Sequence, residues 1–183
     1  MEVTVNGNIL RLVVGDITAQ KTEAIVNAAN GTLLGGGGVD GAIHRAAGPE
    51  LLEECKKIRR EDLKGELLPT GQAVMTKGYK LPAKYVIHTV GPVWHGGANN
   101  EDELLADCFR NSLELAQKHG IKSISFPAIS TGAYRFPINR AAEISVRTVY
   151  DYLKERSFGE AVFVLFSEKD FEAFKKALQS IAK

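Results

Sequence analysis

The sequence predicts an α/β protein, a three-layer α/β/α sandwich with a central mixed sheet, on three observations. Short apolar segments typical of buried strands alternate with amphipathic segments of helical period. Most of these strand segments are apolar throughout, as expected for strands of a parallel sheet covered on both faces. No repeat, low-complexity stretch or linker divides the 183 residues. We therefore expect a single domain over residues 1–183.

The first half of the chain carries clear turn and helix signals. Asn6-Gly7 is a dipeptide that favours a tight hairpin. Pro49 suits the first position of a helix, and a charged, Pro/Gly-punctuated loop is expected at 59–71. We expect strands at 2–5, 8–14 and 24–27, and helices at 39–47 and from Pro49 to about Arg60.

In the second half, an acidic first turn from Glu101 and a glycine stop at Gly120 bound a helix ending near His119. Pro137 opens another helix with apolar positions at helical spacing. We expect strands at 73–77, 85–90, 123–126 and 161–166, and a final helix lined by Phe171, Phe174, Leu178 and Ile181.

Charge and hydropathy exclude several classes of partner. The 23 basic and 22 acidic side chains give a net charge of +1, so bulk charge does not attract DNA, RNA or an anionic membrane. The chain has no secretion-like start and no apolar run of about 18 residues. We expect a soluble monomer, cytoplasmic in a bacterium.

Two features have alternative interpretations. Cys55 and Cys108 have neither CxxC nor Cys/His spacing, which favours buried thiols over a metal site or a disulfide. The basic residues near position 58 alternate with acidic ones, which favours a solvated helix face over a basic patch. These residues are Lys56, Lys57, Arg59 and Arg60, with Glu53, Glu54, Glu61 and Asp62.

A glycine-rich stretch between a strand and a helix organises the candidate site. Gly35 to Gly38 are four consecutive glycines, and ordering such a loop costs conformational entropy. Bare backbone amides beside a helix N-terminus suit an anion, most often a phosphate. Asn30 and Asp40 are the polar side chains that flank this predicted phosphate cradle.

Three loops rich in suitable residues each follow an apolar strand, at 15–18, 27–40 and 130–136. Ligands of open α/β sheets bind beyond the strand ends, so these loops could converge there. Two phosphate cradles with aromatic residues imply a diphosphate that carries adenine and sugars. The spacing is neither GxGxxG nor that of a P-loop, so no motif supports a dinucleotide dehydrogenase or a nucleoside triphosphatase.

Five segments together resemble the macrodomain family, and within it the MacroD-type subgroup. The resemblance covers practically the whole chain, in order. It implies an ADP-ribose-binding fold that hydrolyses the ester between ADP-ribose and an acidic protein side chain and deacetylates O-acetyl-ADP-ribose. It implies no cofactor. The segments are Val14-Gly15-Asp16-Ile17-Thr18, Asn27-Ala28-Ala29-Asn30, Gly35-Gly36-Gly37-Gly38-Val39-Asp40-Gly41-Ala42-Ile43-His44, Val86-Ile87-His88-Thr89-Val90-Gly91-Pro92 and Ser130-Thr131-Gly132-Ala133-Tyr134.

By this resemblance, Asp16 accepts from the adenine amino group, Phe166 stacks on the adenine and Asn30 bonds the distal ribose, beside which Asp40 acts. The catalytic pair implied is Asn30 and Asp40. The implied ligand-binding residues are Gly15, Asp16, Ile17, Asn27, Gly35, Gly36, Gly37, Gly38, Val39, Ser130, Thr131, Gly132, Ala133, Tyr134 and Phe166. The implied partners are ADP-ribose, O-acetyl-ADP-ribose and mono-ADP-ribosylated proteins.

The residue chemistry agrees with these roles but leaves alternatives. An ester hydrolase needs an activated water and a stabilised oxyanion. Asp40, the only carboxylate of the glycine loop, can orient or deprotonate water, although a substrate phosphate could also hold it. Asn30 suits a ribose diol. No His, Cys and acid cluster suggests a metal.

Structural roles are the alternatives at each site position. Asp16 could cap a turn, Asp40 could interact only with a helix dipole, and Asn30 could be a left-handed turn residue. Phe166 could be core. His44 and His88 are interpreted as structural histidines, with His88 a hydrogen-bonded core residue.

One position departs from the family pattern. The third loop of macrodomains usually has glycine between its two aromatics, where this chain has Arg135 between Tyr134 and Phe136. A positive φ there is awkward for arginine. The rival functions are an ADP-ribose reader without turnover and, less favoured by charge, a nucleic-acid binder.

Overall fold

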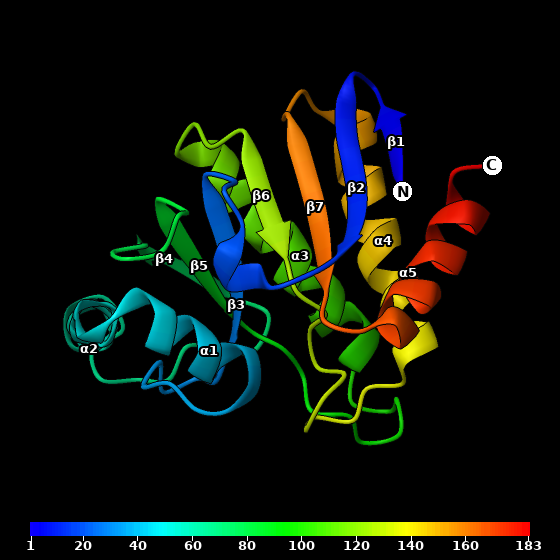
Figure 1. Ribbon diagram of the computed structural model, residues 1–183. Helices are drawn as coiled ribbons and strands as arrows, with labels where there is room; N and C mark the ends of the chain where they lie inside the picture. The colour runs from blue at the N-terminus through cyan, green and yellow to red at the C-terminus, as the bar shows by residue number, and fades with distance from the viewer.

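Seven strands, five α-helices and one short 3-10 helix make up the computed structural model, which describes residues 1–183 (Figure 1). The strands form one mixed sheet between two helical layers, which confirms the expected α/β/α sandwich. The elements are β1 (Glu2–Val5), β2 (Asn8–Val14), the 3-10 helix η1 (Ile17–Ala19), β3 (Ala24–Ala29), α1 (Gly38–Ala47), α2 (Pro49–Glu61), β4 (Ala73–Lys77), β5 (Tyr85–Val90), α3 (Glu101–Lys118), β6 (Ser123–Phe126), α4 (Ile138–Glu155), β7 (Glu160–Leu165) and α5 (Glu168–Ile181).

The strand order is β1-β2-β7-β6-β3-β5-β4. The five central strands run parallel, and β1 and β4 are antiparallel edges. Parallel strands bring their C-terminal ends to one edge of the sheet, the lower edge in Figure 1. The three loops that the sequence analysis selected therefore lie along the same edge.

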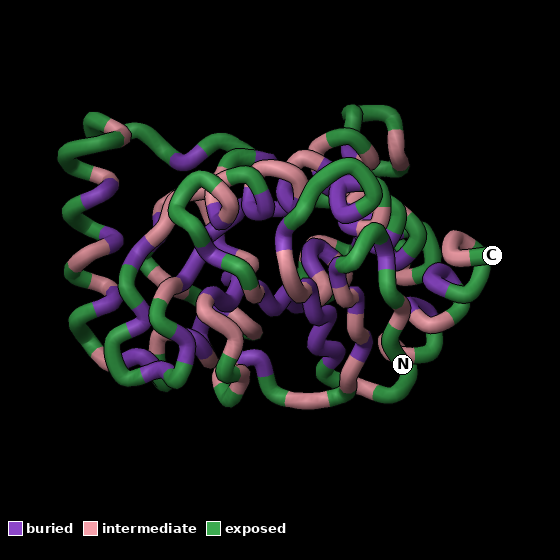
Figure 2. Tube along the Cα trace, turned by 90° about the horizontal axis from the view of Figure 1, so that it is seen from above, coloured by how far each residue is buried: buried purple, intermediate pink, exposed green.

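Both faces of the central strands are buried, which explains their uniformly apolar sequences. Along β3, Ile25 and Ala29 face the core under α1 and α2, whereas Ala24 and Val26 face the core under α3, α4 and α5. The second core is the larger, with 30 buried residues against 16. Figure 2 shows the buried segments in the interior and the alternation of buried and exposed residues along α2, at the left.

Aromatic side chains tie the larger core together. The ring centroids of Phe109 and Phe126 are 5.2 Å apart, and those of Phe163 and Phe174 are also 5.2 Å apart. Tilted aromatic pairs at this distance add stabilisation beyond their buried area. The larger core therefore joins α3, β6, β7 and α5 into a rigid base for the loops at the sheet edge.

The structure differs from the sequence-based prediction at two strand ends. β3 continues to Ala29, because Ala28 and Ala29 pair with Thr89 and Val90 of β5. β7 ends at Leu165, so Phe166 lies outside it and is 88% exposed, which excludes the core alternative for this residue.

The expected turn at Asn6-Gly7 is confirmed, since both residues have the positive φ that a type I′ hairpin needs. No helix has the length and hydropathy needed to span a membrane.

Candidate active site

A cavity of about 360 Å³ lies at the sheet edge, beyond the ends of β3, β5 and β6. It brings together most of the glycine loop and the third loop, as the sequence analysis expected. Seven of the predicted site residues do not line it: Gly15, Asp16, Ile17, Asn27, Gly35, Thr131 and Phe166. Its lining consists of Ala28, Ala29, Asn30, Gly36, Gly37, Gly38, Val39, Asp40, Gly91, Ala128, Ile129, Ser130, Gly132, Ala133 and Tyr134.

Glycine is required where the loop meets α1. A Cβ on Gly41 would lie 2.5 Å from the carbonyl oxygen of Gly36, so the helix and the loop approach each other closely only without a side chain there. No side chain caps the N-terminus of α1, and its N-cap residue is Gly37. Uncapped N–H groups at this end suit an anion.

Asn30 and Asp40 face the same point of the cavity. A Cβ on Gly36 would lie 3.3 Å from Asn30 Nδ2 and 3.5 Å from Asp40 Oδ2. A side chain at position 36 would therefore project between the two candidate catalytic groups. The bare backbone of the loop leaves this space free for a ligand.

Asp40 is a buried carboxylate with one supported oxygen. Its residue is only 5% exposed, and Oδ1 accepts a hydrogen bond of 2.8 Å from Asn27 Nδ2 and lies 3.4 Å from His44 Nε2. Oδ2 is buried without a partner. Desolvation raises the pKa of Asp40, although the Asn27 hydrogen bond and the charge of His44 work in the opposite direction.

A chain of buried polar side chains lies behind Asp40. Asn27 Nδ2 also lies 3.1 Å from His88 Nδ1, and His88 Nε2 lies 2.9 Å from Thr76 Oγ1. Burial and the nearby charge of His44 lower the pKa of His88 to about 3, so its ring is neutral at neutral pH. Because Asn27 Nδ2 donates to both neighbours, His88 Nδ1 must accept and Nε2–H must donate to Thr76.

The hydrogen bonds among Asp40, Asn27, His88 and Thr76 indicate a supporting role for Asn27. The resemblance implies a ligand-binding role for Asn27, but Asn27 is 0% exposed and its amide donates to Asp40 Oδ1. His88 is the hydrogen-bonded core histidine that was expected, yet its connection to Asp40 was not predicted. Alternation along the strands was the available signal, since Asn27 and His88 sit on paired positions of β3 and β5.

The side chain of Asn30 forms hydrogen bonds to two points of the loop that follows it, Thr32 and Gly35. Its Oδ1 accepts from the backbone N–H of Thr32 and from Thr32 Oγ1, and its Nδ2 donates to the carbonyl of Gly35 at 2.9 Å. The φ angle of Asn30 is not positive, so the left-handed turn alternative is wrong. One Nδ2 hydrogen of Asn30 has no partner in the protein.

The third loop is folded tightly against the loop after β5. Ser130 is buried with a φ of +68° and an unpartnered Oγ. A Cβ on Gly91 would lie 2.2 Å from that Oγ, so only glycine fits beside it. Arg135 has a φ of +63° and an exposed side chain, which means that arginine occupies the left-handed conformation for which macrodomains usually use glycine.

The remaining predicted residues lie further along the same edge. Gly15 donates its backbone N–H to the carbonyl of Leu165, which puts Asp16 and Phe166 at the ends of the adjacent strands β2 and β7.

Asp16 caps η1, since its Oδ1 accepts from Thr18 N at 2.9 Å, which confirms the turn-capping alternative. The adenine contact stays a prediction. Hydrogen bonds from the side chain and backbone of Thr18 lower the pKa of Asp16. The side chain of Ile17 is buried.

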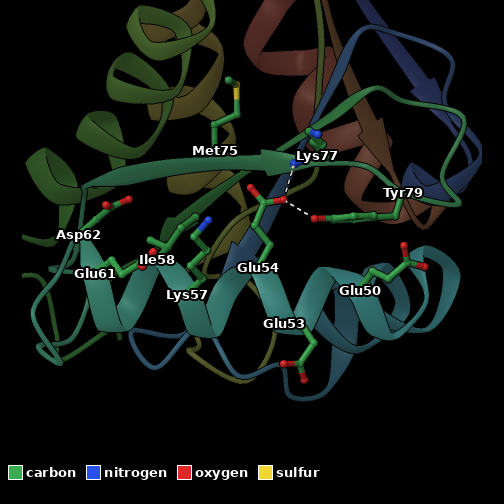
Figure 3. Close-up of a pocket in the computed structure, with 10 residues that line it drawn as sticks. All are labelled: Glu50, Glu53, Glu54, Lys57, Ile58, Glu61, Asp62, Met75, Lys77 and Tyr79. Atoms are coloured by element: carbon green, nitrogen blue, oxygen red, sulfur yellow. Dashed lines mark hydrogen bonds between the residues drawn. The ribbon is translucent and has the colours of Figure 1, made fainter.

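A larger hollow, about 750 Å³, lies away from this site, between α2 and β4 (Figure 3). There Glu54 accepts from the backbone N–H of Lys77 at 3.0 Å and from the hydroxyl of Tyr79 at 2.7 Å. The hydrogen bond to Glu54 raises the pKa of Tyr79 to about 12. These contacts cover one N–H of an edge strand, which is a structural role.

The two cysteines are buried free thiols, as expected. Desolvation, together with the charges of Asp40 and Glu54, raises the pKa of Cys55 to about 12. Desolvation also raises the pKa of Cys108 to about 11. Neither thiol forms the thiolate that a reactive cysteine needs.

Comparison with known proteins identifies the family. The sequence model of the Macro domain family matches residues 26–145. The chain is a macrodomain. The resemblance noted in the sequence is thereby confirmed.

Three similar proteins illustrate how close the match is. A macrodomain of Oceanobacillus iheyensis solved with ADP is 51% identical, has a TM-score of 0.98 and covers 100% of this chain and 96% of its own. A Macro domain-containing protein of Methanosarcina mazei is 58% identical over 94% of this chain and 89% of its own length. A protein of Escherichia fergusonii named O-acetyl-ADP-ribose deacetylase is 57% identical over 90% of this chain and 92% of its own length.

Proposed function

We propose that this macrodomain is an ADP-ribosyl hydrolase that cleaves esters at the distal ribose of ADP-ribose. Its substrates are O-acetyl-ADP-ribose and proteins that carry mono-ADP-ribose on acidic side chains. The observation that carries the proposal is the convergence of Asn30 Nδ2 and the buried, unpartnered Asp40 Oδ2 on one point above Gly36.

The length of the sheet edge supports ADP-ribose as the ligand. Three strand spacings separate β2 from β3, roughly 14 Å at about 4.8 Å per strand. Adenine would lie at the β2 and β7 end, between Asp16 and Phe166. The distal ribose would lie at the β3 end, next to Asn30 and Asp40, and the diphosphate between them over the uncapped N-terminus of α1.

The reaction in this cleft is hydrolysis. A water adds to the ester carbonyl, the bond between the acyl carbon and the ribose oxygen breaks, and the ribose hydroxyl takes a proton. The products are ADP-ribose and a carboxylate, which is acetate or the protein side chain. Asp40 Oδ2 accepts from the attacking water, and Asn30 Nδ2 donates to the ribose and fixes its orientation.

The relatives named O-acetyl-ADP-ribose deacetylase favour turnover over simple binding. The rival function is an ADP-ribose reader without turnover, and a reader has less need of a buried carboxylate beside the ribose. Burying an ionisable group costs stability, so its presence argues for a chemical task.

Incubation of the protein with O-acetyl-ADP-ribose, and separately with a protein mono-ADP-ribosylated on glutamate, tests the proposal. Mass spectrometry should detect free ADP-ribose from both. Tight binding of ADP-ribose without release from either substrate would identify a reader and contradict the proposal. Release only from the acetylated compound would limit the function to deacetylation.

A further inference from the structure

Helix α2 separates its charges onto two faces. Glu50, Glu53, Glu54 and Glu61 line the hollow beside β4, together with Asp62 and a single helix lysine, Lys57 (Figure 3). Lys56, Arg59 and Arg60 instead line a different hollow on the side of the loop at 31–35. Spacings of three and four residues keep each set on one face. Most of these charged side chains are exposed, as expected for a solvated helix face, but the acidic and basic ones gather on different sides of the helix.

The second hollow, which we name the basic hollow, has a volume of about 400 Å³ and no acidic lining residue. Its residues are Leu34, Lys56, Arg59, Arg60, Lys64 and Gly65. Arg60 and Lys64 are exposed and have no acidic partner within 4.0 Å, and Lys56 has only a 3.5 Å contact with the exposed Glu53. Four cations thus meet in one place, in a chain whose net charge is +1.

The basic hollow is joined directly to the candidate active site. Arg59 Nη1 donates to the carbonyl of Thr32 at 2.9 Å, and Thr32 N donates to Asn30 Oδ1 at 3.1 Å. Leu34, which lines the basic hollow, follows Asn30 by four residues, so their Cα atoms are at most about 14 Å apart. A ligand in the basic hollow therefore lies beside the ribose end of the cleft.

We propose that the basic hollow docks acidic residues that flank the modified side chain of a protein substrate. This inference rests on the proposed function, because it names what lies beyond the ester in a protein-linked substrate. Acidic flanks are the complementary chemistry for four cations, and the half-exposed Leu34 offers an apolar contact to a peptide. The acidic face of α2 lies next to the basic hollow, so the positively charged surface is short. A long polyanion such as a nucleic acid would therefore meet like charge, which disfavours its binding.

The double variant Arg60→Ser/Lys64→Ser tests the proposal, with Lys57→Ser on the acidic face of α2 as the matched control. Three substrates are compared: a glutamate-linked mono-ADP-ribosyl peptide with acidic flanks, the same peptide with serine and glycine flanks, and O-acetyl-ADP-ribose. The double variant should raise KM for the acid-flanked peptide about 3–10-fold, as expected for two exposed ion pairs. The other two substrates and the control should be unaffected, and 0.5 M salt should remove the difference.

Other outcomes would overturn the proposal. These are equal KM values for the two peptides in the wild type, an equal loss on all three substrates, or the same loss in Lys57→Ser. A ten-nucleotide single strand that binds as tightly as the acid-flanked peptide, and loses binding in the double variant, would assign the basic hollow to nucleic acid instead.

Failure of the proposed function can be told apart from failure of docking. If the wild type releases no ADP-ribose from either peptide, both peptides survive and their Kd values can be measured directly. Acid flanks should then tighten binding to the wild type and to Lys57→Ser, but not to the double variant. Equal Kd values for the two uncleaved peptides would overturn docking.

Discussion

Asp40 has the properties of a residue kept for chemistry at the expense of stability. It is buried, one of its oxygens has no partner, and desolvation raises its pKa. Because the folded pKa lies above the unfolded value, ionisation of Asp40 destabilises the fold. That cost is absent below the unfolded pKa and fully present above the folded one.

Replacing Asp40→Asn should therefore raise the Tm at pH 7 and lower turnover roughly 10²–10⁴-fold, as for a lost general base. Asparagine can still accept the Asn27 hydrogen bond, so the loop should keep its shape. Calorimetry at pH 7 and at pH 3 measures the first effect, and the Tm difference should shrink at the lower pH. A variant with wild-type turnover would remove Asp40 from the mechanism.

His88 is fully buried behind Asn27, so we expect it to affect the site only through the hydrogen bonds that orient Asp40. In His88→Leu, one Asn27 Nδ2 hydrogen loses its buried acceptor, which should cost about 1–3 kcal/mol in the free energy of unfolding. We expect kcat to fall with KM for O-acetyl-ADP-ribose nearly unchanged, because Asp40 loses its orientation.

Thr76→Val is the matched control for His88→Leu. It removes the partner of His88 Nε2 but leaves the hydrogen bond between Asn27 and Asp40 in place. Its loss of stability should be similar and its loss of kcat smaller. Equal kcat in His88→Leu and the wild type, despite lower stability, would mean that the hydrogen bonds from Asp40 to Thr76 have only a structural role.

At the scale of elements, the site depends on how closely α1 approaches the glycine loop. In Gly41→Ala, the new Cβ would lie 2.5 Å from the Gly36 carbonyl, so the loop or the helix must move. We expect a loss of about 1–3 kcal/mol in unfolding free energy, and a higher Kd for ADP-ribose in titration calorimetry. Gly37→Ala is the stability control, because its Cβ would meet nothing within 4 Å. Equal Tm values for the two variants would contradict this account.

A buried carboxylate at the first residue of α3 holds the loop that leads into the helix. Glu101 is 1% exposed and accepts from the backbone N–H groups of His95, Gly97 and Asn99 at 2.6–2.9 Å. Desolvation would raise the pKa of Glu101, but these N–H donors outweigh it and lower the pKa to about 2.

Because the folded pKa of Glu101 is depressed, its stabilisation is present above the unfolded value near 4.5 and is lost as pH falls towards 2. Glu101→Gln should therefore lower the Tm at pH 7, with a difference that disappears near pH 2. Thermal unfolding followed by circular dichroism across this range measures the effect. A Tm difference that is independent of pH would show that charge is not the cause.

At the scale of the whole molecule, most of the fold could be predicted from local patterns. The strands at 73–77, 85–90 and 123–126 have the predicted bounds, because apolar runs and turn residues mark them. The separation of charges on α2 and the chain from Asp40 to Thr76 could not be predicted. They depend on which elements face each side chain. The spacing of residues within one strand or helix does not reveal which other elements pack against it.

The two ends of the cleft also differ in how well the sequence predicted them. The glycine loop and Ser130 do converge, because parallel strands place their following loops at one edge. Asp16 and Phe166 lie at that edge but outside the 360 Å³ cavity, on β2 and β7. Only a ligand long enough to span the cleft would contact both Asp16 and Phe166 at one end and the glycine loop at the other.

The most direct test of this account is a crystal structure of the Asp40→Ala variant with ADP-ribose. The account predicts adenine against Phe166 and Asp16, the diphosphate over Gly37 to Val39, and the distal ribose within hydrogen-bond distance of Asn30 Nδ2. ADP-ribose bound elsewhere, or bound in the cleft with its distal ribose away from Asn30 and position 40, would contradict it.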